Sequence, residues 1–184
     1  VNEKETDNSA QTDCNGSSYL NIYAGKVDFY YAFSNHIKMS FGAEYNHTRD
    51  EGWLKYDADR IQSANFVNTE NRAGMYVSTN IDLDRMSLEA GLRYEMQDSK
   101  YNNRIDNREN VNREYFHFFP SFSISSKNSL WNNSLFFSVR TTRPTFRQLS
   151  NANFYISDVK YQQGNPLLKP SYLSILQWSS GYKW

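Results

Sequence analysis

The chain has 184 residues, and 20 Lys and Arg balance 20 Asp and Glu, which excludes the strongly basic surface of a nucleic-acid-binding protein. Aromatic residues make up 16% of the chain, a share that excludes a disordered protein. The single cysteine, Cys14, excludes an internal disulfide and a thiolate metal cluster, and no apolar run reaches the length of a transmembrane helix.

Seven segments of the chain are predicted to be β-strands. Six of them alternate apolar and polar side chains with a period of two, which places the two kinds on opposite faces of an extended strand. These are residues 26–33, 37–46, 72–81, 85–95, 116–124 and 134–141. The seventh, 172–182, is ambiguous. Leu176, Trp178 and Tyr182 favour one face as apolar, and Leu173 and Ile175 favour the other.

The charges of these strands all fall on one of the two faces. Within 85–95, for example, Leu88 and Leu92 share a face that carries no Lys, Arg, Asp or Glu, whereas Glu89 and Arg93 lie on the other. We expect the apolar face to meet lipid and the charged face to line a wet lumen. The side chains predicted to face the lumen are Lys26, Asp28, Glu44, Arg72, Tyr76, Glu89, Arg93, Glu95 and Arg140.

The connections alternate strictly between short and long. Short turns are predicted near 34–36, 82–85 and 126–133, and long loops near 49–70, 98–113 and 143–171, with a polar loop or disordered segment at 1–17. In a meander, this alternation puts all tight turns at one end, as in outer-membrane barrels. Strands of about 10–12 residues also suit a tilted membrane crossing better than a soluble sheet. The fold class is therefore predicted to be all-β, an antiparallel up-and-down meander of about seven long strands forming part of a transmembrane β-barrel.

Two segments of the chain resemble a known family. Residues 138–155, SVRTTRPTFRQLSNANFY, and 163–178, QGNPLLKPSYLSILQW, are similar to TonB-dependent receptors, most of all to the Bacteroidetes-type outer-membrane β-barrel branch. In that family an Arg-Pro step ends a strand, and a Gly-Asn-Pro-x-Leu-Lys-Pro segment leads into the next strand. Here these are Arg143-Pro144 and residues 164–170. The resemblance covers most of the chain from about residue 18 onward.

The resemblance implies a role in active import across the bacterial outer membrane. The full receptor would be a barrel of about 22 strands with a plug in its lumen, of which residues 18–184 would be a fragment of the wall. It would bind a scarce solute outside the cell: a siderophore, a cobalamin-like compound or an oligosaccharide. Its partners would be outer-membrane lipid, the plug of the same parent chain, the TonB complex through parts absent from this chain, and the ligand, with no nucleic acid and no cofactor.

The long loops hold the candidate ligand contacts. Exposed aromatic rings there suit stacking on sugars or on siderophore rings, although they would equally suit packing of the loops on one another. The candidate ligand contacts are the aromatic residues Trp53, Tyr56, Phe154, Tyr155 and Tyr161, together with Arg143 and Asn165.

Other chemistries have little support in the sequence. The three histidines show no metal-ligand spacing, and the acidic loop residues Asp50, Glu51, Asp57 and Asp59 lack the regular spacing of a calcium loop. No nucleophile or oriented base accompanies the charged strands, so we expect no enzyme activity. The alternatives are a passive barrel or adhesin and a soluble β-sandwich binding module. Pro120 interrupts a predicted strand, and we expect a bulge there.

Overall fold

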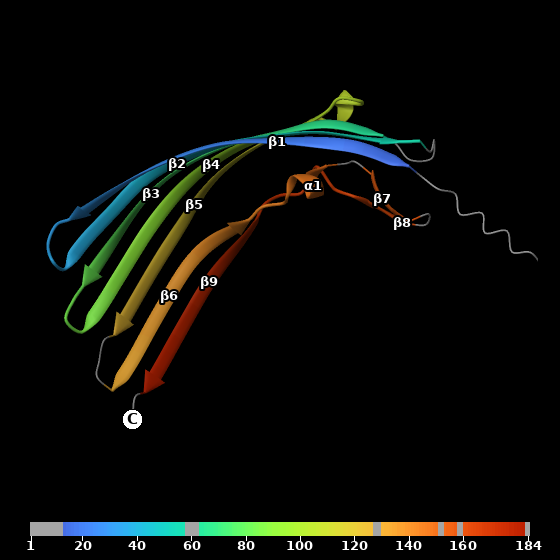
Figure 1. Ribbon diagram of the computed structural model, residues 1–184. Coiled ribbons are helices and arrows are strands. Elements are labelled where there is room, and N and C mark those ends of the chain that lie inside the picture. Colours follow the sequence, from blue (N-terminus) through green and yellow to red (C-terminus); the bar gives the residue numbers. More distant parts are fainter. Residues whose placement is uncertain (1–12, 58–62, 127–129, 151–152, 158–159, 183–184) are drawn as a thin grey trace, which may run out of the picture.

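The computed structural model describes residues 13–57, 63–126, 130–150, 153–157 and 160–182. It shows one antiparallel sheet with the strand order β1-β2-β3-β4-β5-β6-β9, curved into an arch (Figure 1). The strands are β1 (Cys14–Ala32), β2 (Ile37–Tyr56), β3 (Ala64–Asp82), β4 (Met86–Asn103), β5 (Val111–Ser126), β6 (Trp131–Thr142) and β9 (Ser171–Tyr182). Shorter elements are η1 (Asn107–Glu109), α1 (Phe146–Leu149), β7 (Asn153–Ser157) and β8 (Lys160–Gln163). The predicted all-β meander of seven strands is confirmed.

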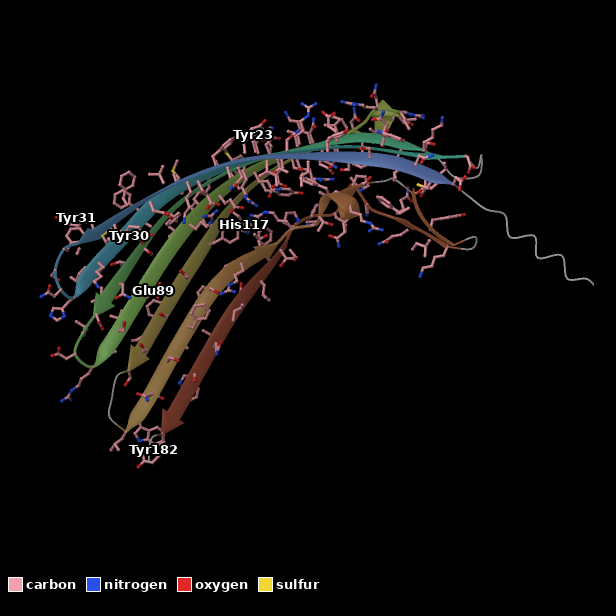
Figure 2. All side chains as sticks on the ribbon, in the orientation of Figure 1. Tyr23, Tyr30, Tyr31, Glu89, His117 and Tyr182 are labelled. Atoms are coloured by element: carbon pink, nitrogen blue, oxygen red, sulfur yellow. The ribbon has the colours of Figure 1, made fainter. Side chains whose placement is uncertain are left out.

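An apolar band covers the convex face of the sheet. The strand register places its side chains in five rows, which occupy residues 25–33, 37–45, 73–81, 88–96 and 116–124. These stretches lie on the first five strands, except that Phe33 follows the last residue of β1 and donates its N–H to the Ile37 carbonyl. Each stretch is nine residues long, the length that a tilted strand needs to cross a bilayer. In Figure 2, Tyr23 lies on the convex side, just beyond this band, whereas Glu89 and His117 lie on the concave side.

The register of β9 decides its ambiguous face. Leu176 pairs with Phe137 and Trp178 pairs with Leu135, so both lie in the apolar rows of the convex face. Both are more than 70% exposed. Leu173 and Ile175 lie on the concave face, opposite Arg140 and Ser138.

The long connections are shorter than the sequence predicted. β2 continues to Tyr56 and β3 already begins at Ala64, so most of the segment 49–70 is strand. In the same way β4 runs to Asn103 and β5 begins at Val111 within the segment 98–113, while β1 begins at Cys14, inside the predicted polar segment 1–17. The reason is physical. Beyond the apolar band both faces meet water, so these strand ends lose the alternation that identifies a strand.

Pro120 ends one ladder without forming a bulge. β5 pairs with β4 in an unbroken register through Pro120, so the predicted bulge is absent. The ladder to β6, however, covers only Ser121–Ser125 of β5. A proline has no N–H to donate. From Pro120 toward the end of the sheet that carries the long connections, β5 and β6 are separated. The last residues of β6, 139–142, pair with β9 alone.

The small buried core lies at the end of the sheet that carries the long connections. Phe66 and Tyr101 are buried there, with Leu54, Ala64, Val111 and Phe154 packed around them. Among the residues that the structure describes, no helix is long and apolar enough to span a membrane.

Candidate functional site

Three charged side chains connect β4 to β2 across β3 on the concave face. Arg93 on β4 forms an ion pair with Glu44 on β2 and another with Glu95 at 2.9 Å. To reach Glu44, the Arg93 side chain crosses β3 at Gly74, where a Cβ atom would lie 2.7 Å from its guanidinium. Gly74 therefore makes room for a guanidinium that lies flat on the sheet. Arg93 is about a quarter exposed and Glu95 is nearly buried, so these charges gain more than a surface pair would.

Arg143 connects this charged group to the segment that follows β6. Its guanidinium forms an ion pair with Glu95 and donates from Nε to the Gln97 side-chain oxygen at 2.9 Å. Gln97 in turn donates to Glu70 at 2.9 Å. Burial lowers the pKa of the Arg143 guanidinium, and the nearby Arg72 lowers it further. The ion pair with Glu95 offsets this cost, so Arg143 is one of the contacts that hold the segment after β6 to the wall.

Beyond Pro120, the ends of β6 and β9 pass beneath β5 on the concave side. By strand alternation Tyr172 belongs to the convex face of β9, yet its ring stacks on His117 of the concave face of β5 at 3.6 Å between centroids. Phe119 packs beside both rings. At this point the convex face of β9 therefore covers the concave face of β5. Figure 1 shows β6 and β9 bending under the arch toward α1.

The described residues of the connection from β6 to β9, which are 143–150, 153–157 and 160–170, consequently lie on the concave side of the sheet. We call residues 143–170 the inner loop. Phe154 of β7 packs beside the core of Phe66 and Tyr101, and the Tyr56 hydroxyl donates to the Asn153 carbonyl at 2.6 Å. A cavity of about 300 Å³ remains between the inner loop and the sheet, lined by Gly16, Ser17, Ser18, Gly52, Trp53, Leu54, Phe66 and Phe154.

A tight turn closes the inner loop at Gly164-Asn165-Pro166. The Asn165 N–H donates to the Gln148 carbonyl at 2.7 Å, and the Asn165 side chain accepts from the Leu167 N–H at 2.9 Å. Thr145 and Gln148 cap α1 reciprocally at the other side of this contact. The Gly-Asn-Pro segment thus fastens the return strand of the loop to the short helix at its start.

We expect Gly164→Ala to loosen the inner loop. A Cβ atom at Gly164 would lie 2.5 Å from the Gln148 carbonyl oxygen and 2.6 Å from that of Arg147, and these are backbone atoms that cannot move alone. Overpacking of this kind costs about 1–3 kcal/mol. Limited proteolysis of the loop in outer membranes should become faster. Gly181→Ala is the control, since a Cβ atom there meets nothing within 4 Å; equal cleavage in the two variants would contradict this packing.

Comparison with known proteins agrees with these features. A family model described as an outer membrane protein beta-barrel family matches residues 1–184. The chain belongs to this family. The barrel wall therefore lies in the bacterial outer membrane, with lipid against its convex face, and the soluble β-sandwich alternative is wrong. No curated protein matches the chain.

The nine side chains predicted to face the lumen all lie on the concave face of the barrel wall. They do not form one cluster. Arg93, Glu95 and Glu44 are paired, and Lys26 forms a second group with Asp28 at 3.0 Å and with the ring of Tyr76 at 5.5 Å. Arg72 lies 3.9 Å from Glu70, whereas Glu89 and Arg140 are exposed.

The predicted ligand contacts of the loops have different environments. Tyr161 is 60% exposed in β8, so it remains available to a ligand. Tyr56 is buried and Asn165 closes a turn, so both are structural. The register puts Trp53 on the outer face of β2, and Phe154 packs against the core. Arg143 pairs with Glu95, as described above, and the side chain of Tyr155 lies outside the described part.

The sequence did not indicate Gln97, Glu70 or Tyr172 as parts of this site. Tyr172 had the position of an interfacial ring near a strand end, and nothing local separates that role from stacking on His117. Within the described residues no group of His, Cys, Asp or Glu side chains is arranged to hold a metal ion. Asp59 of the acidic loop falls outside that part of the chain.

Proposed function

We propose that this chain supplies part of the wall and the extracellular binding surface of a TonB-dependent receptor. In this account the receptor binds a siderophore, a cobalamin-like compound or an oligosaccharide and imports it actively. The plug and the TonB complex act through other parts of the parent protein, and no catalytic step is involved. The seven-stranded sheet has open edges at β1 and β9, and a membrane-spanning sheet requires closure by further strands.

The inner loop is the observation that carries this proposal. It places exposed polar and aromatic groups, such as Tyr161, Gln162 and Arg147, on the concave side at the end with the long connections. Arg147 also lies over the Phe154 ring at 4.7 Å. A solute entering the lumen would meet this surface first. The Arg-Pro and Gly-Asn-Pro-x-Leu-Lys-Pro segments that resemble TonB-dependent receptors begin and end this same loop.

Uptake measurements with and without energy coupling test the proposal. Strains that express or lack the protein are supplied with a radiolabelled ferric catecholate, a ferric hydroxamate, cobalamin or a malto-oligosaccharide. We expect one class to accumulate only in the expressing strain, and this accumulation to disappear when the TonB complex is deleted. Uptake that persists without the TonB complex would instead indicate a passive channel. Normal uptake of every probe without the protein would indicate an adhesin or another role.

A further inference from the structure

A groove lies on the convex, lipid-facing side of the sheet, away from the charged concave face. Its volume is about 550 Å³, within the usual range for small-ligand sites. Strands β1 to β4 all contribute to it. Lys26, Glu44 and Gly74 border it from positions between the rows, and the other residues that line it belong to two neighbouring rows of the apolar band. They are Gly25, Tyr45, Ala73 and Met96 in one row and Val27, Ala43, Met75 and Tyr94 in the next.

The floor of the groove consists of small residues. Gly25, Ala43 and Ala73 are diagonal neighbours on three adjacent strands, and a Cβ atom added at Gly25 would meet nothing within 4 Å. Two of the larger side chains around them, Tyr45 and Tyr94, are held by contacts outside this floor. The Tyr45 hydroxyl donates to Asn71 at 3.0 Å in the polar row above, and the Tyr94 ring packs on Phe118 of β5 at 5.0 Å.

The position of the groove indicates what fills it. It occupies the two rows of the apolar band nearest the long connections, which lie on the extracellular side of outer-membrane barrels. The next row toward the long connections is polar, and its His47 and Asn71 side chains are hydrogen-bonded at 2.7 Å. An apolar groove that ends at a polar rim, on a face already in contact with membrane lipid, matches a lipid whose chain lies along the wall and whose headgroup meets the rim.

We propose that this groove binds one acyl chain of an outer-leaflet lipid and retains that lipid on the barrel. The chain lies over Gly25, Ala43 and Ala73, and the ester and headgroup region lies level with Tyr45, His47 and Asn71. The driving force is apolar contact along the floor, which adds up per methylene group of the chain.

Native mass spectrometry of the protein extracted from its own outer membranes in mild detergent tests this assignment. We expect a stoichiometric acylated lipid on the natural protein, identified by its fragment masses. In Ala43→Phe and Ala73→Phe the retained lipid should fall roughly tenfold, the effect of expelling about two methylene groups. Ala90→Phe adds the same bulk to the convex face outside the groove and should retain the lipid.

The outcomes separate the possible occupants. Heat-modifiable electrophoretic mobility first shows that each variant is folded, and a variant that fails to fold is replaced by Gly25→Leu, which projects into open space. Equal lipid retention in folded groove variants and in the natural protein would overturn the proposal. So would a stoichiometric polypeptide in place of the lipid, since the groove would then be a protein interface.

Discussion

Leu92→Arg should block assembly of the barrel in the outer membrane. Leu92 lies in the middle of the five apolar rows, in register with Phe41, Val77 and Pro120, and its side chain points to lipid. Arginine at mid-bilayer costs about 2–4 kcal/mol, and the cost falls to about 0–1 kcal/mol near the interfaces. Leu88 belongs to the last row beside the short turns, so Leu88→Arg should be much milder. The folded fraction in outer membranes, measured by heat-modifiable mobility, gives the comparison.

Ser121→Arg is the matched control for this prediction. Ser121 lies at nearly the same depth on the concave face and is exposed there. An added guanidinium would point into the lumen, where the wall already carries Arg93 and Arg140. We expect near-normal assembly, and the same holds for Ser87→Arg near the short turns. Equal damage from Leu92→Arg and Ser121→Arg would contradict the assignment of the two faces.

Arg143→Met should loosen the attachment of the inner loop to the wall. The substitution removes the ion pair with Glu95 and the hydrogen bond to Gln97. Hydrogen bonds to charged groups are worth about 1.5–3 kcal/mol, and Arg93 continues to neutralise Glu95, so the sheet itself should stay folded. Losing about 1.5–3 kcal/mol of the free energy that keeps the loop closed raises its open population roughly tenfold to hundredfold. Trypsin cleavage after Arg147 and Lys160 in outer membranes should accelerate accordingly.

Arg140→Met separates this effect from a general loss of charge. Arg140 lies three residues earlier on the concave face of β6 and is exposed. The loop should be cleaved at the natural rate in this variant. Arg143→Lys keeps the charge but lacks the planar guanidinium that contacts Glu95 and Gln97 together, so its loop should be cleaved at an intermediate rate. A loop that is cleaved no faster in Arg143→Met than in Arg140→Met would show that the contacts of Arg143 do not hold it.

Much of the membrane-spanning sheet could be predicted from the sequence, because lipid on one face and water on the other impose a strict alternation. Leu88 and Leu92 on one side and Glu89 and Arg93 on the other follow from this rule alone. Where both faces of a strand meet water, apolar and polar side chains no longer alternate and the strand cannot be recognised in this way. Residues 49–56 of β2 therefore resembled a loop, although they are paired strand throughout.

The course of the inner loop could not be derived in the same way. Pro120 and Pro144 indicate where ladders end, but no local pattern tells whether the freed strands continue the wall or bend beneath it. The direction follows from contacts between distant segments, such as His117 with Tyr172 and Tyr56 with Asn153. Arg143 was a candidate from its family resemblance, whereas its partner Gln97 gave no signal because a single glutamine on a strand is not distinctive.

Cysteine cross-linking across the β5–β6 separation tests the central claim, that the inner loop lies against the concave face. In a Cys14→Ser background, a short bismaleimide is applied in outer membranes to His117→Cys paired with Tyr172→Cys or with Thr142→Cys. The stacked rings of His117 and Tyr172 predict efficient cross-linking of the first pair. If β6 instead continued the ladder of β5 in its register, residue 142 would lie opposite residue 117, and residue 172 would face lipid. Cross-linking of the 117–142 pair alone would therefore contradict the account.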